Sequence, residues 1–321
     1  KYVVTNGSGI HVYADYDPSI EWVNVRRHGA AGTGGDDTAA INAAIAAMSP
    51  GGTLYFPPGS NSNYGISAPV QLKPGCVMGM ANGSTITALS PTGDLFVLAD
   101  PYHHVEGLQF KVADGVTRQA GNAAIKVNNG SVSRIRLCRF WDQAHSIWIT
   151  DQFGATITLE ALEINRSVPG ASTCIQIDAG YDVTIADVII SNTVDAMPSF
   201  GISISAAGDV EILNTSVLCC EYGLNVFVPA GKVLASLWAS MSFFDNCGRG
   251  ASLIADGGSI VRCGFNRCWF SSSHVDHGFF AGTGATGIVD GMALTDCDLF
   301  LNAANGFISY SPSVKHVDLV G

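Results

Sequence analysis

The chain has 321 residues, of which 47% are hydrophobic, 13% are charged and 37 are glycines. Its formal net charge of −11 argues against a nucleic-acid partner, because phosphate binding requires a basic surface. The sequence contains no run of about 18 apolar residues, so we expect no membrane insertion. No linker rich in Pro or Ser interrupts it either, which favours one elongated domain.

The N-terminal part predicts a short capping element. Asp36 or Asp37 is a natural N-cap for an amphipathic helix over residues 37–48, and Pro50-Gly51-Gly52 ends it. A strand over residues 53–56 follows. A helix ahead of a solenoid covers the open apolar end of the first coil. The predicted divisions are an N-terminal lead-in at residues 1–22, a capping segment at 23–90 and a repetitive region, continuous with the cap, at 91–321.

From Leu95 onward a small residue, an apolar residue, a variable residue and a second apolar residue recur about every 27 residues. Such a period is typical of a solenoid. Within each unit, apolar and polar residues alternate between turns rich in Gly, Asp and Asn, which predicts strands rather than helices. The sequence therefore predicts an all-β protein, a parallel β-helix of about nine or ten coils. The first apolar positions are Ile125, Ile147, Ile175, Ile202, Leu224, Ala251, Phe279 and Phe307.

Nine cysteines are scattered at one or two per coil, without paired CxxC spacing. This distribution favours small core residues over a disulfide framework or a metal site. We therefore expect no metal site and no cofactor.

Four segments of the cap resemble the pectate-lyase-like β-helix superfamily, which includes the phage tailspike depolymerases. The resemblance implies a right-handed parallel β-helix that cleaves or binds a polysaccharide, and tailspike relatives form homotrimers. It is specific over residues 23–90 and only architectural beyond them. The segments are Val25–Gly32, Asp36–Ile41, Gly51–Gly59 and Leu72–Gly79.

The catalytic motifs of this superfamily are not present in full. Its polygalacturonases carry Asn-Thr-Asp, Asp-Asp and Gly-His-Gly followed by Arg-Ile-Lys, and its lyases use acidic calcium ligands that we do not identify in this chain. The resemblance therefore gives the functional face but no catalytic residue. Calcium is expected only if the protein is a lyase.

A first group of candidates precedes the first strand of successive coils. Equivalent positions on adjacent coils are about 4.8 Å apart, so groups one or two coils apart have the spacing that paired carboxylates use in glycoside hydrolysis. The alternative is that Asp and Asn occupy these turns because their side chains form hydrogen bonds with the nearby backbone. We predict carboxylate catalysts at Glu221, Asp245 and Asp276, and substrate-binding roles for Arg249 and His277.

A second group lies on the outward side of the same strand. An exposed Trp beside amides and a carboxylate is the usual chemistry of a sugar site. Trp148, Gln176 and Asn225 are the predicted substrate contacts, and Asp178 is a further candidate catalyst. The alternative for Trp148 is that a loop or a neighbouring chain covers it.

A third group follows the tight turn onto the adjoining sheet. Unpaired like charges on neighbouring coils would raise at least one pKa, as a general acid requires, but a solvated acidic stripe has the same pattern. These runner-up catalysts are Glu160, Glu163, Asp187 and Glu211.

The favoured function is a polysaccharide-cleaving β-helix, a glycoside hydrolase or alternatively a polysaccharide lyase. The absence of the pectinase motifs favours a phage tailspike depolymerase on bacterial surface polysaccharide. We accordingly expect a homotrimer in a virion or a secreted protein. The alternatives are a non-catalytic glycan-binding or structural β-helix and a secreted pectinase-like lyase, hydrolase or epimerase.

Overall fold

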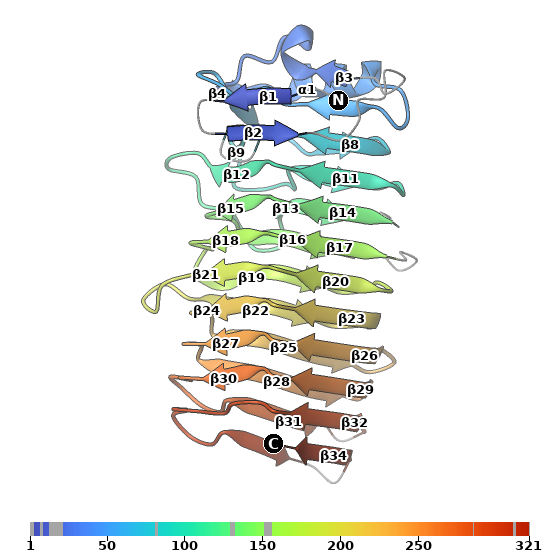
Figure 1. The fold of residues 1–321 in the computed structure, drawn as a ribbon, viewed down its shortest axis with the longest axis vertical. Helices are drawn as coiled ribbons and strands as arrows, with labels where there is room; N and C mark the ends of the chain where they lie inside the picture. Colours follow the sequence, from blue (N-terminus) through green and yellow to red (C-terminus); the bar gives the residue numbers. More distant parts are fainter. Residues whose placement is uncertain are drawn as a thin grey trace.

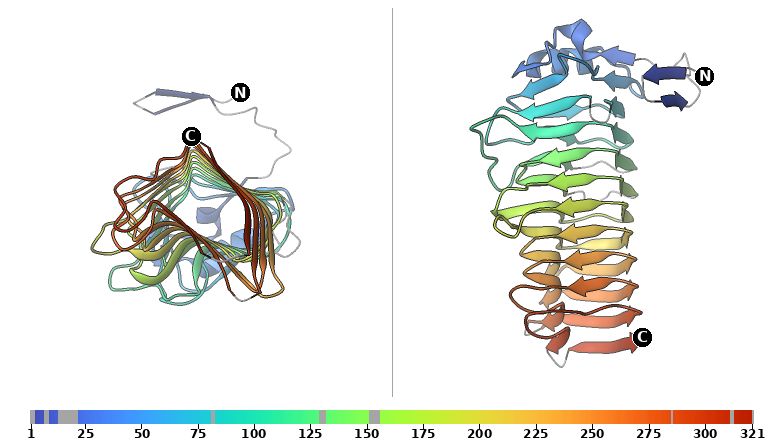
Figure 2. Two further views of the ribbon diagram at one scale, coloured as in Figure 1. Left: turned by 90° about the horizontal axis from the view of Figure 1, so that it is seen from below. Right: turned by 60° about the vertical axis from the view of Figure 1, so that its left-hand side comes forward.

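The structure is a computed structural model that describes residues 3–6, 9–12, 22–80, 83–128, 132–150, 156–284, 286–310 and 313–320. It is a right-handed parallel β-helix in which each complete coil passes through three parallel sheets (Figure 1). Seen along the axis, successive coils superimpose and enclose the core (Figure 2). The predicted fold class is therefore confirmed. Of the predicted lead-in, β1 (Val3–Asn6) and β2 (Gly9–Val12) form an antiparallel pair, and the rest up to residue 21 lies outside the described residues.

Each sheet is built from one strand of every coil. Sheet 1 contains β7 (Val70–Leu72), β10 (Phe96–Leu98), β13 (Ala123–Val127), β16 (His145–Ile149), β19 (Gly170–Ile177), β22 (Pro198–Ile204), β25 (Tyr222–Pro229), β28 (Arg249–Asp256), β31 (Phe279–Thr283) and β33 (Phe307–Tyr310). Sheet 2 contains β3 (Trp22–Asn24), β5 (Thr53–Tyr55), β8 (Gly75–Met78), β11 (His103–Glu106), β14 (Ser133–Arg136), β17 (Ile157–Glu160), β20 (Val183–Ala186), β23 (Ala207–Leu213), β26 (Val233–Ser240), β29 (Ser259–Asn266), β32 (Ile288–Thr295) and β34 (Val314–Val320). Sheet 3 contains β4 (Thr33–Asp36), β6 (Asn63–Ile66), β9 (Thr85–Ala88), β12 (Gln109–Val112), β15 (Arg139–Trp141), β18 (Glu163–Asn165), β21 (Ile189–Ser191), β24 (Ser216–Leu218), β27 (Phe243–Asp245) and β30 (Trp269–Ser271).

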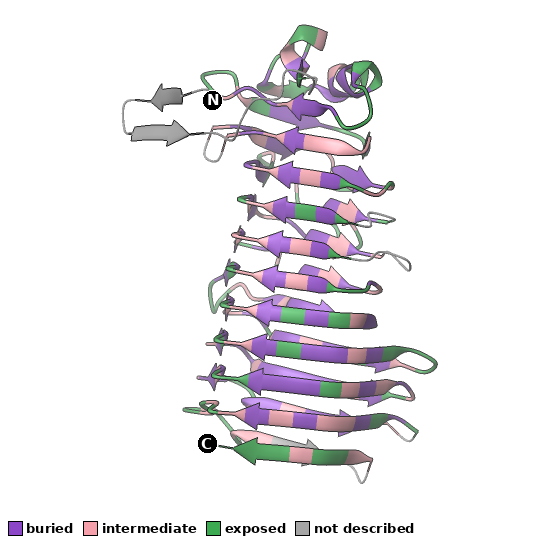
Figure 3. Ribbon diagram, turned by 45° about the vertical axis from the view of Figure 1, so that its right-hand side comes forward, coloured by how far each residue is buried: buried purple, intermediate pink, exposed green. Residues whose placement is uncertain are grey.

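The strand register confirms the predicted inward column. Ile147 pairs with Ile175, Ile175 with Ile202, and Ile202 with Leu224. All four side chains are fully buried. The alternation of buried and exposed residues is visible along the strands of sheet 2 (Figure 3). Because each apolar side chain lies above and below its equivalents, the core is continuous along the solenoid.

The N-terminal helix covers the first coil, as predicted. Helix α1 (Thr38–Ala47) buries Ile41, and the 3-10 helix η1 (Val25–His28) packs beside it. Two neighbouring aspartates accept different hydrogen bonds at the start of helix α1. The Asp36 carboxylate accepts hydrogen bonds from the backbone N–H (3.0 Å) and the hydroxyl (2.5 Å) of Thr38. Asp37 occupies the N-cap position, but its carboxylate accepts from the backbone N–H groups of residues 31 and 32 (2.7 and 3.0 Å), which fixes the preceding loop.

From β14 onward, the corner between sheets 2 and 3 is turned by one residue with positive φ in each coil. Only Gly, Asn and Asp adopt this left-handed conformation at low cost, yet several corners carry larger side chains. Their backbone N–H groups remain in the ladder; that of Leu137, for example, donates to the carbonyl of Glu160 in the next coil (3.1 Å). The corner residues are Leu137, Ala161, Asp187, Asn214, Met241, Arg267 and Asp296, with φ between 44° and 56°.

Six of the nine cysteines are buried, as expected for small core residues: Cys138, Cys174, Cys220, Cys247, Cys263 and Cys268. Among the residues that the structure describes, neither helix has the length and hydropathy that a bilayer-spanning segment needs.

We expect the Ile185→Asp variant to be severely destabilised. Ile185 is 0% exposed in β20, and an unpaired buried charge costs several kcal/mol. Ala186→Asp is the matched control, because the same side chain is introduced one position further along the strand, where the residue faces outward and is half-buried. Thermal unfolding followed by circular dichroism measures both, and equal melting temperatures would show that position 185 does not face the core.

Candidate functional site

The outward face of sheet 1 carries four of the predicted substrate-binding residues, Trp148, Gln176, Asn225 and Arg249, in two parallel columns. Both Cys174 and Ile175 are buried, so the strands bend there and the residues on either side of this pair face outward. The first column consists of His145, Thr173, Phe200, Tyr222 and Arg249. The second consists of Lys126, Trp148, Gln176, Ser203 and Asn225.

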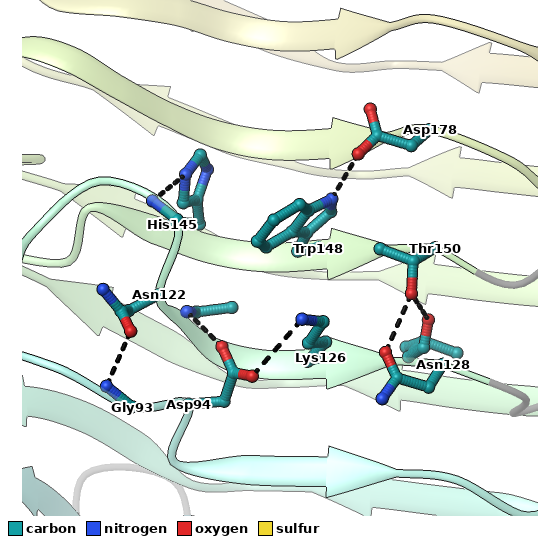
Figure 4. Close-up of polar contacts among 12 residues, drawn as sticks. Gly93, Asp94, Asn122, Lys126, Asn128, His145, Trp148, Thr150 and Asp178 are labelled. Carbon is teal, nitrogen blue, oxygen red and sulfur yellow. Dashed lines mark hydrogen bonds and ion pairs between the residues drawn. The ribbon is translucent and has the colours of Figure 1, made fainter.

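Asp178, Trp148, Lys126 and Asp94 lie near one another on the outward side of neighbouring coils (Figure 4). Together with Gln176, which contacts Asp178, they form a group that we call the Trp148 cluster. The indole Nε1 of Trp148 donates to Oδ2 of Asp178 (2.6 Å). Oδ1 accepts from the side-chain amide of Gln176 (2.5 Å) and from the hydroxyl of Ser205 (3.1 Å). The three donors hold this carboxylate in one orientation on the face of sheet 1.

The ring of Trp148 is partly covered by its own neighbours. The ammonium group of Lys126 lies 4.4 Å from the ring centroid and 3.6 Å from the carboxylate of Asp94. The ring of His145 lies 5.3 Å away on the same coil. The predicted open sugar platform is therefore a half-buried indole with a cation over it, and the cover comes from this chain itself.

A buried arginine fixes the loop beside this cluster. Arg118 is only 1% exposed, and its guanidinium donates to the carbonyl oxygens of Ser90 (2.9 Å) and Gly93 (2.5 Å). The same loop presents the backbone N–H of Gly121 to Nε2 of His145 (3.1 Å), so this nitrogen is an acceptor and the ring is neutral. These contacts hold the loop against the cluster.

Burial lowers the pKa values of His145 and His103 below the ordinary value of 6.5. The unfolded chain therefore takes up these protons first as the pH falls below about 6.5, and the free energy of unfolding should decrease between pH 7 and pH 5. His145→Gln removes one titrating group and should show a smaller decrease in urea unfolding. A decrease equal to that of the parent would contradict the assignment.

A second group, the Arg249 cluster, lies at the other end of the sheet 1 strands and comprises Glu221, Tyr222, Arg249, Asp276 and His277. Nε and Nη2 of Arg249 lie 2.9 and 2.7 Å from Oδ2 of Asp276. Oδ1 of Asp276 lies 2.7 Å from Nε2 of His277. The remaining guanidinium nitrogen, Nη1, donates to the hydroxyl of Tyr222. Asp276 is thus engaged in holding Arg249.

A hollow of about 580 Å³ opens beside this cluster. It is lined by Glu221, Tyr222, Arg249, Val275 and the loop at residues 194–197. Glu221 and Asp195 are exposed in it, and we find no hydrogen bond or ion pair for either carboxylate within the described part of the chain. Two carboxylates without partners and one oriented guanidinium therefore converge on one cavity.

The sequence gives no signal for Asp195. It lies in the loop between β21 and β22, where the backbone N–H of Ala196 donates to the carbonyl of Thr193 (3.0 Å) and closes a turn. The fold of this loop places Asp195 beside the sheet 1 strands of the following coils, which begin at Tyr222 and Arg249. Its polar sequence just before a sheet 1 strand is the one feature that it shares with the predicted positions.

The structure separates the predicted carboxylates into different places. The strand register aligns Thr173 with Phe200 and Phe200 with Tyr222, the chain neighbour of Glu221. Asp178 follows Thr173 by five residues, which is roughly 15 Å of strand. Asp178 therefore lies far from Glu221. Asp245 ends β27 in sheet 3, where it accepts from the backbone N–H (2.9 Å) and the side-chain amide (3.2 Å) of its neighbour Asn246.

Asn225 lies between the two clusters in the second outward column. Its side-chain amide donates to the hydroxyl of Ser203 (3.3 Å). It therefore belongs to the polar surface that joins the Arg249 cluster to the Trp148 cluster.

The runner-up acids do not form the expected group of unpaired like charges. Glu160 is paired with Arg134 on sheet 2, and Glu163 with Arg139 on sheet 3 (2.8 Å). Asp187 lies at a corner and accepts from the side-chain amide of Asn214 (2.7 Å). Arginines on the preceding coil, which the spacing of acids alone does not reveal, account for the difference at Glu160 and Glu163. Glu211 faces a hollow on the outward side of sheet 2.

Comparison with protein families gives one match. The model described as "Rhamnogalacturonase A/epimerase, pectate lyase-like" matches residues 22–252, which covers the cap and most of the solenoid. Among curated proteins, none matches the sequence significantly.

Several solved structures share the fold. The enzymatically active domain of tailspike protein 2 from bacteriophage CBA120 has a TM-score of 0.62 at 15% identity, over 96% of this chain and 45% of that one. The endo-xylogalacturonan hydrolase of Aspergillus tubingensis gives 0.56 at 13% identity, over 92% of this chain and 95% of that one. The A-module of the Azotobacter vinelandii mannuronan C-5 epimerase gives 0.54 at 14% identity, over 94% and 96%. At these identities the likeness extends to the fold, and this chain spans less than half of the tailspike domain.

Proposed function

Because the chain belongs to the rhamnogalacturonase A/epimerase, pectate lyase-like family, we propose that it cleaves a polysaccharide, and that it does so as a glycoside hydrolase. The observation that carries this proposal is the hollow beside the Arg249 cluster, which two carboxylates without partners, Glu221 and Asp195, share with Arg249. Hydrolysis of a glycosidic bond uses two carboxyl groups that flank the bond, and this hollow combines two carboxylates with an oriented cation.

In this reaction one of the two groups, in its acid form, gives its proton to the glycosidic oxygen as the bond to the anomeric carbon breaks. The other, as a carboxylate, either takes the proton of a water that attacks this carbon or attacks the carbon itself. Arg249 and Tyr222 bind hydroxyl or acidic groups of the sugar. Asp276 acts as a positioning residue, because its carboxylate holds the guanidinium of Arg249 in place. His277 acts through Asp276, because its ring contacts the other oxygen of that carboxylate.

Sugar units beyond the cleaved bond are proposed to follow the outward columns of sheet 1 toward the Trp148 cluster. Asn225, Gln176 and Asp178 offer amide and carboxylate groups along this path, and the half-buried ring of Trp148 ends it. Asp178 is assigned to binding rather than to catalysis, since three donors already occupy its oxygens.

Glu221→Gln and Asp195→Asn should each lower kcat on the cognate polysaccharide by about a hundredfold or more, because each removes a positioned acid-base group. Asp245→Asn is the matched control and should retain parental activity, since Asp245 lies in sheet 3 outside the hollow. Release of reducing ends measures all three, with folding checked by circular dichroism. Near-parental rates for both hollow variants would refute the assignment.

A second candidate reaction is favoured by the contact between Tyr222 and Arg249. A phenol oxygen beside a guanidinium suits removal of the proton α to a sugar carboxylate, with the cation stabilising the resulting negative charge; this leads to β-elimination or epimerisation. Ultraviolet absorbance of an unsaturated product indicates elimination, whereas saturated reducing ends indicate hydrolysis. Epimerisation gives neither product and is detected by incorporation of solvent deuterium at the carbon α to the carboxylate. Tight retention of the polymer without any of these changes would make the protein a glycan-binding β-helix.

We expect the activity to survive chelation. The described residues contain no group of three or more His, Cys, Asp or Glu side chains arranged to hold a metal ion. EDTA treatment followed by the reducing-end assay tests this, with the untreated protein as control. Loss of activity that calcium restores would favour the lyase alternative.

The biological setting that we propose is a phage tailspike depolymerase acting on bacterial surface polysaccharide, as a homotrimer in a virion; a secreted enzyme is the alternative. The likeness of fold to the tailspike domain of phage CBA120 supports it. The net charge of −11 agrees with a polysaccharide rather than a nucleic acid as the partner. Light scattering of the purified protein gives the oligomeric state, and a monomer under all conditions would count against the trimer.

A further inference from the structure

A second hollow, of about 380 Å³, lies on the outward face of sheet 2, away from the sheet 1 site. Asp182, Thr184, Asp209, Glu211, Ser236 and Trp238 line it. These residues belong to three successive coils, on the side of the solenoid formed by β20, β23 and β26 (Figures 1 and 3).

The indole of Trp238 lies flat on the neighbouring coil. Trp238 pairs with Gly264 in β29, where an added Cβ would come within 2.0 Å of the ring. The ring therefore packs against bare backbone, yet it remains 50% exposed. Tyr181 repeats this arrangement over Gly208, where a Cβ would lie 2.3 Å from its ring, and it is 54% exposed. Aromatic packing over glycine stabilises a sheet, but it does not require half of each ring to face solvent.

The spacing of the two rings suits an extended ligand. The strand register places Tyr181 and Trp238 two coils apart and three residues apart along the strand, roughly 14 Å in total. Asp182 and Asp209, next to Tyr181 and Gly208 in the chain, line the hollow that Trp238 ends. The ring of Trp238 at the end of the hollow and the ring of Tyr181 beside it have a spacing that suits stacking on separate sugars of a short chain of pyranose rings.

The charge of the hollow selects the ligand. We find no hydrogen bond or ion pair for the carboxylates of Asp182, Asp209 or Glu211 among the described residues, and no Lys, Arg or His lines the hollow. The described chain also has no group of acids close enough to hold a metal ion. Such carboxylates accept hydrogen bonds from hydroxyl or ammonium groups and repel acidic sugars. The Arg249 cluster, by contrast, presents a cation.

We propose that this face of sheet 2 is a second carbohydrate-binding site, which takes a neutral or amino-sugar oligosaccharide and acts independently of the sheet 1 site. Trp238 stacks on one sugar ring, and Glu211 and Asp209 accept hydrogen bonds from its hydroxyl or amino groups. The site retains the polymer on the solenoid and takes no part in bond cleavage.

Isothermal titration calorimetry of the full chain with cellotetraose, chitosan tetrasaccharide and tetragalacturonate tests the proposal. We expect at least one of the first two to bind and tetragalacturonate not to bind at this face. Trp238→Ala should weaken that binding about tenfold or more, whereas Trp238→Phe should retain most of it. Phe243→Ala, which removes an aromatic ring of similar exposure (46%) from sheet 3, is the matched control and should change nothing.

Glu211→Gln and Asp209→Asn test the acceptors without removing the packed ring. Both should weaken binding of whichever of the two tetrasaccharides the parent protein binds, and both should leave the melting temperature unchanged. Asp209→Asn should also leave the hydrolytic rate at the sheet 1 site unchanged. The proposal is overturned if neither cellotetraose nor the chitosan binds, or if Trp238→Ala leaves their affinity unchanged. It is equally overturned if Trp238→Ala dissociates an oligomer without affecting sugar binding, because the face is then a contact between copies of the chain. Loss of activity in Glu221→Gln has no bearing on this test, which measures binding alone.

Discussion

The parallel pairing of each strand with its equivalent one coil away is the constraint on which the rest of this structure depends. It fixes the register, so that Ile147, Ile175 and Ile202 form one inward column and Trp148, Gln176 and Ser203 form one outward column. A slip of one residue would exchange the two faces. Core and functional surface are therefore set by the same backbone hydrogen bonds, and the side chains of both faces inherit a spacing of about 4.8 Å.

Periodicity in the sequence was sufficient to predict the inward face and the cap. The columns through Ile175 and Ile202, the helix near residues 38–47 and the outward position of Trp148 all follow from patterns of apolar and small residues, because each reports a local geometric repeat. Such patterns contain no information about the partner of a polar side chain. For this reason the ion pair of Glu160 with Arg134 and the cover of Trp148 by Lys126 emerge only from the structure.

The predicted site residues do not all lie together in the structure, and the reasons have a common origin. Asp245 and Arg249 are close in sequence, yet Asp245 ends a strand of sheet 3 while Arg249 begins one of sheet 1. The corner between them cannot be located by composition. Asp195 was missed because a loop, rather than a repeat, brings it to the hollow. Loop conformation depends on contacts distant in sequence, which a repeat pattern does not encode.

The single left-handed residue at each corner between sheets 2 and 3, from β14 onward, has an evolutionary consequence. A turn that short, with its N–H bonded to the next coil, has no room for an insertion, as Leu137, Ala161 and Met241 illustrate. In these coils, length variation is therefore confined to the segments that enter and leave sheet 1, such as the loop that carries Asp195. The loops that flank sheet 1 can therefore change in length and sequence, and substrate preference can change with them, while the core and the strand register stay the same.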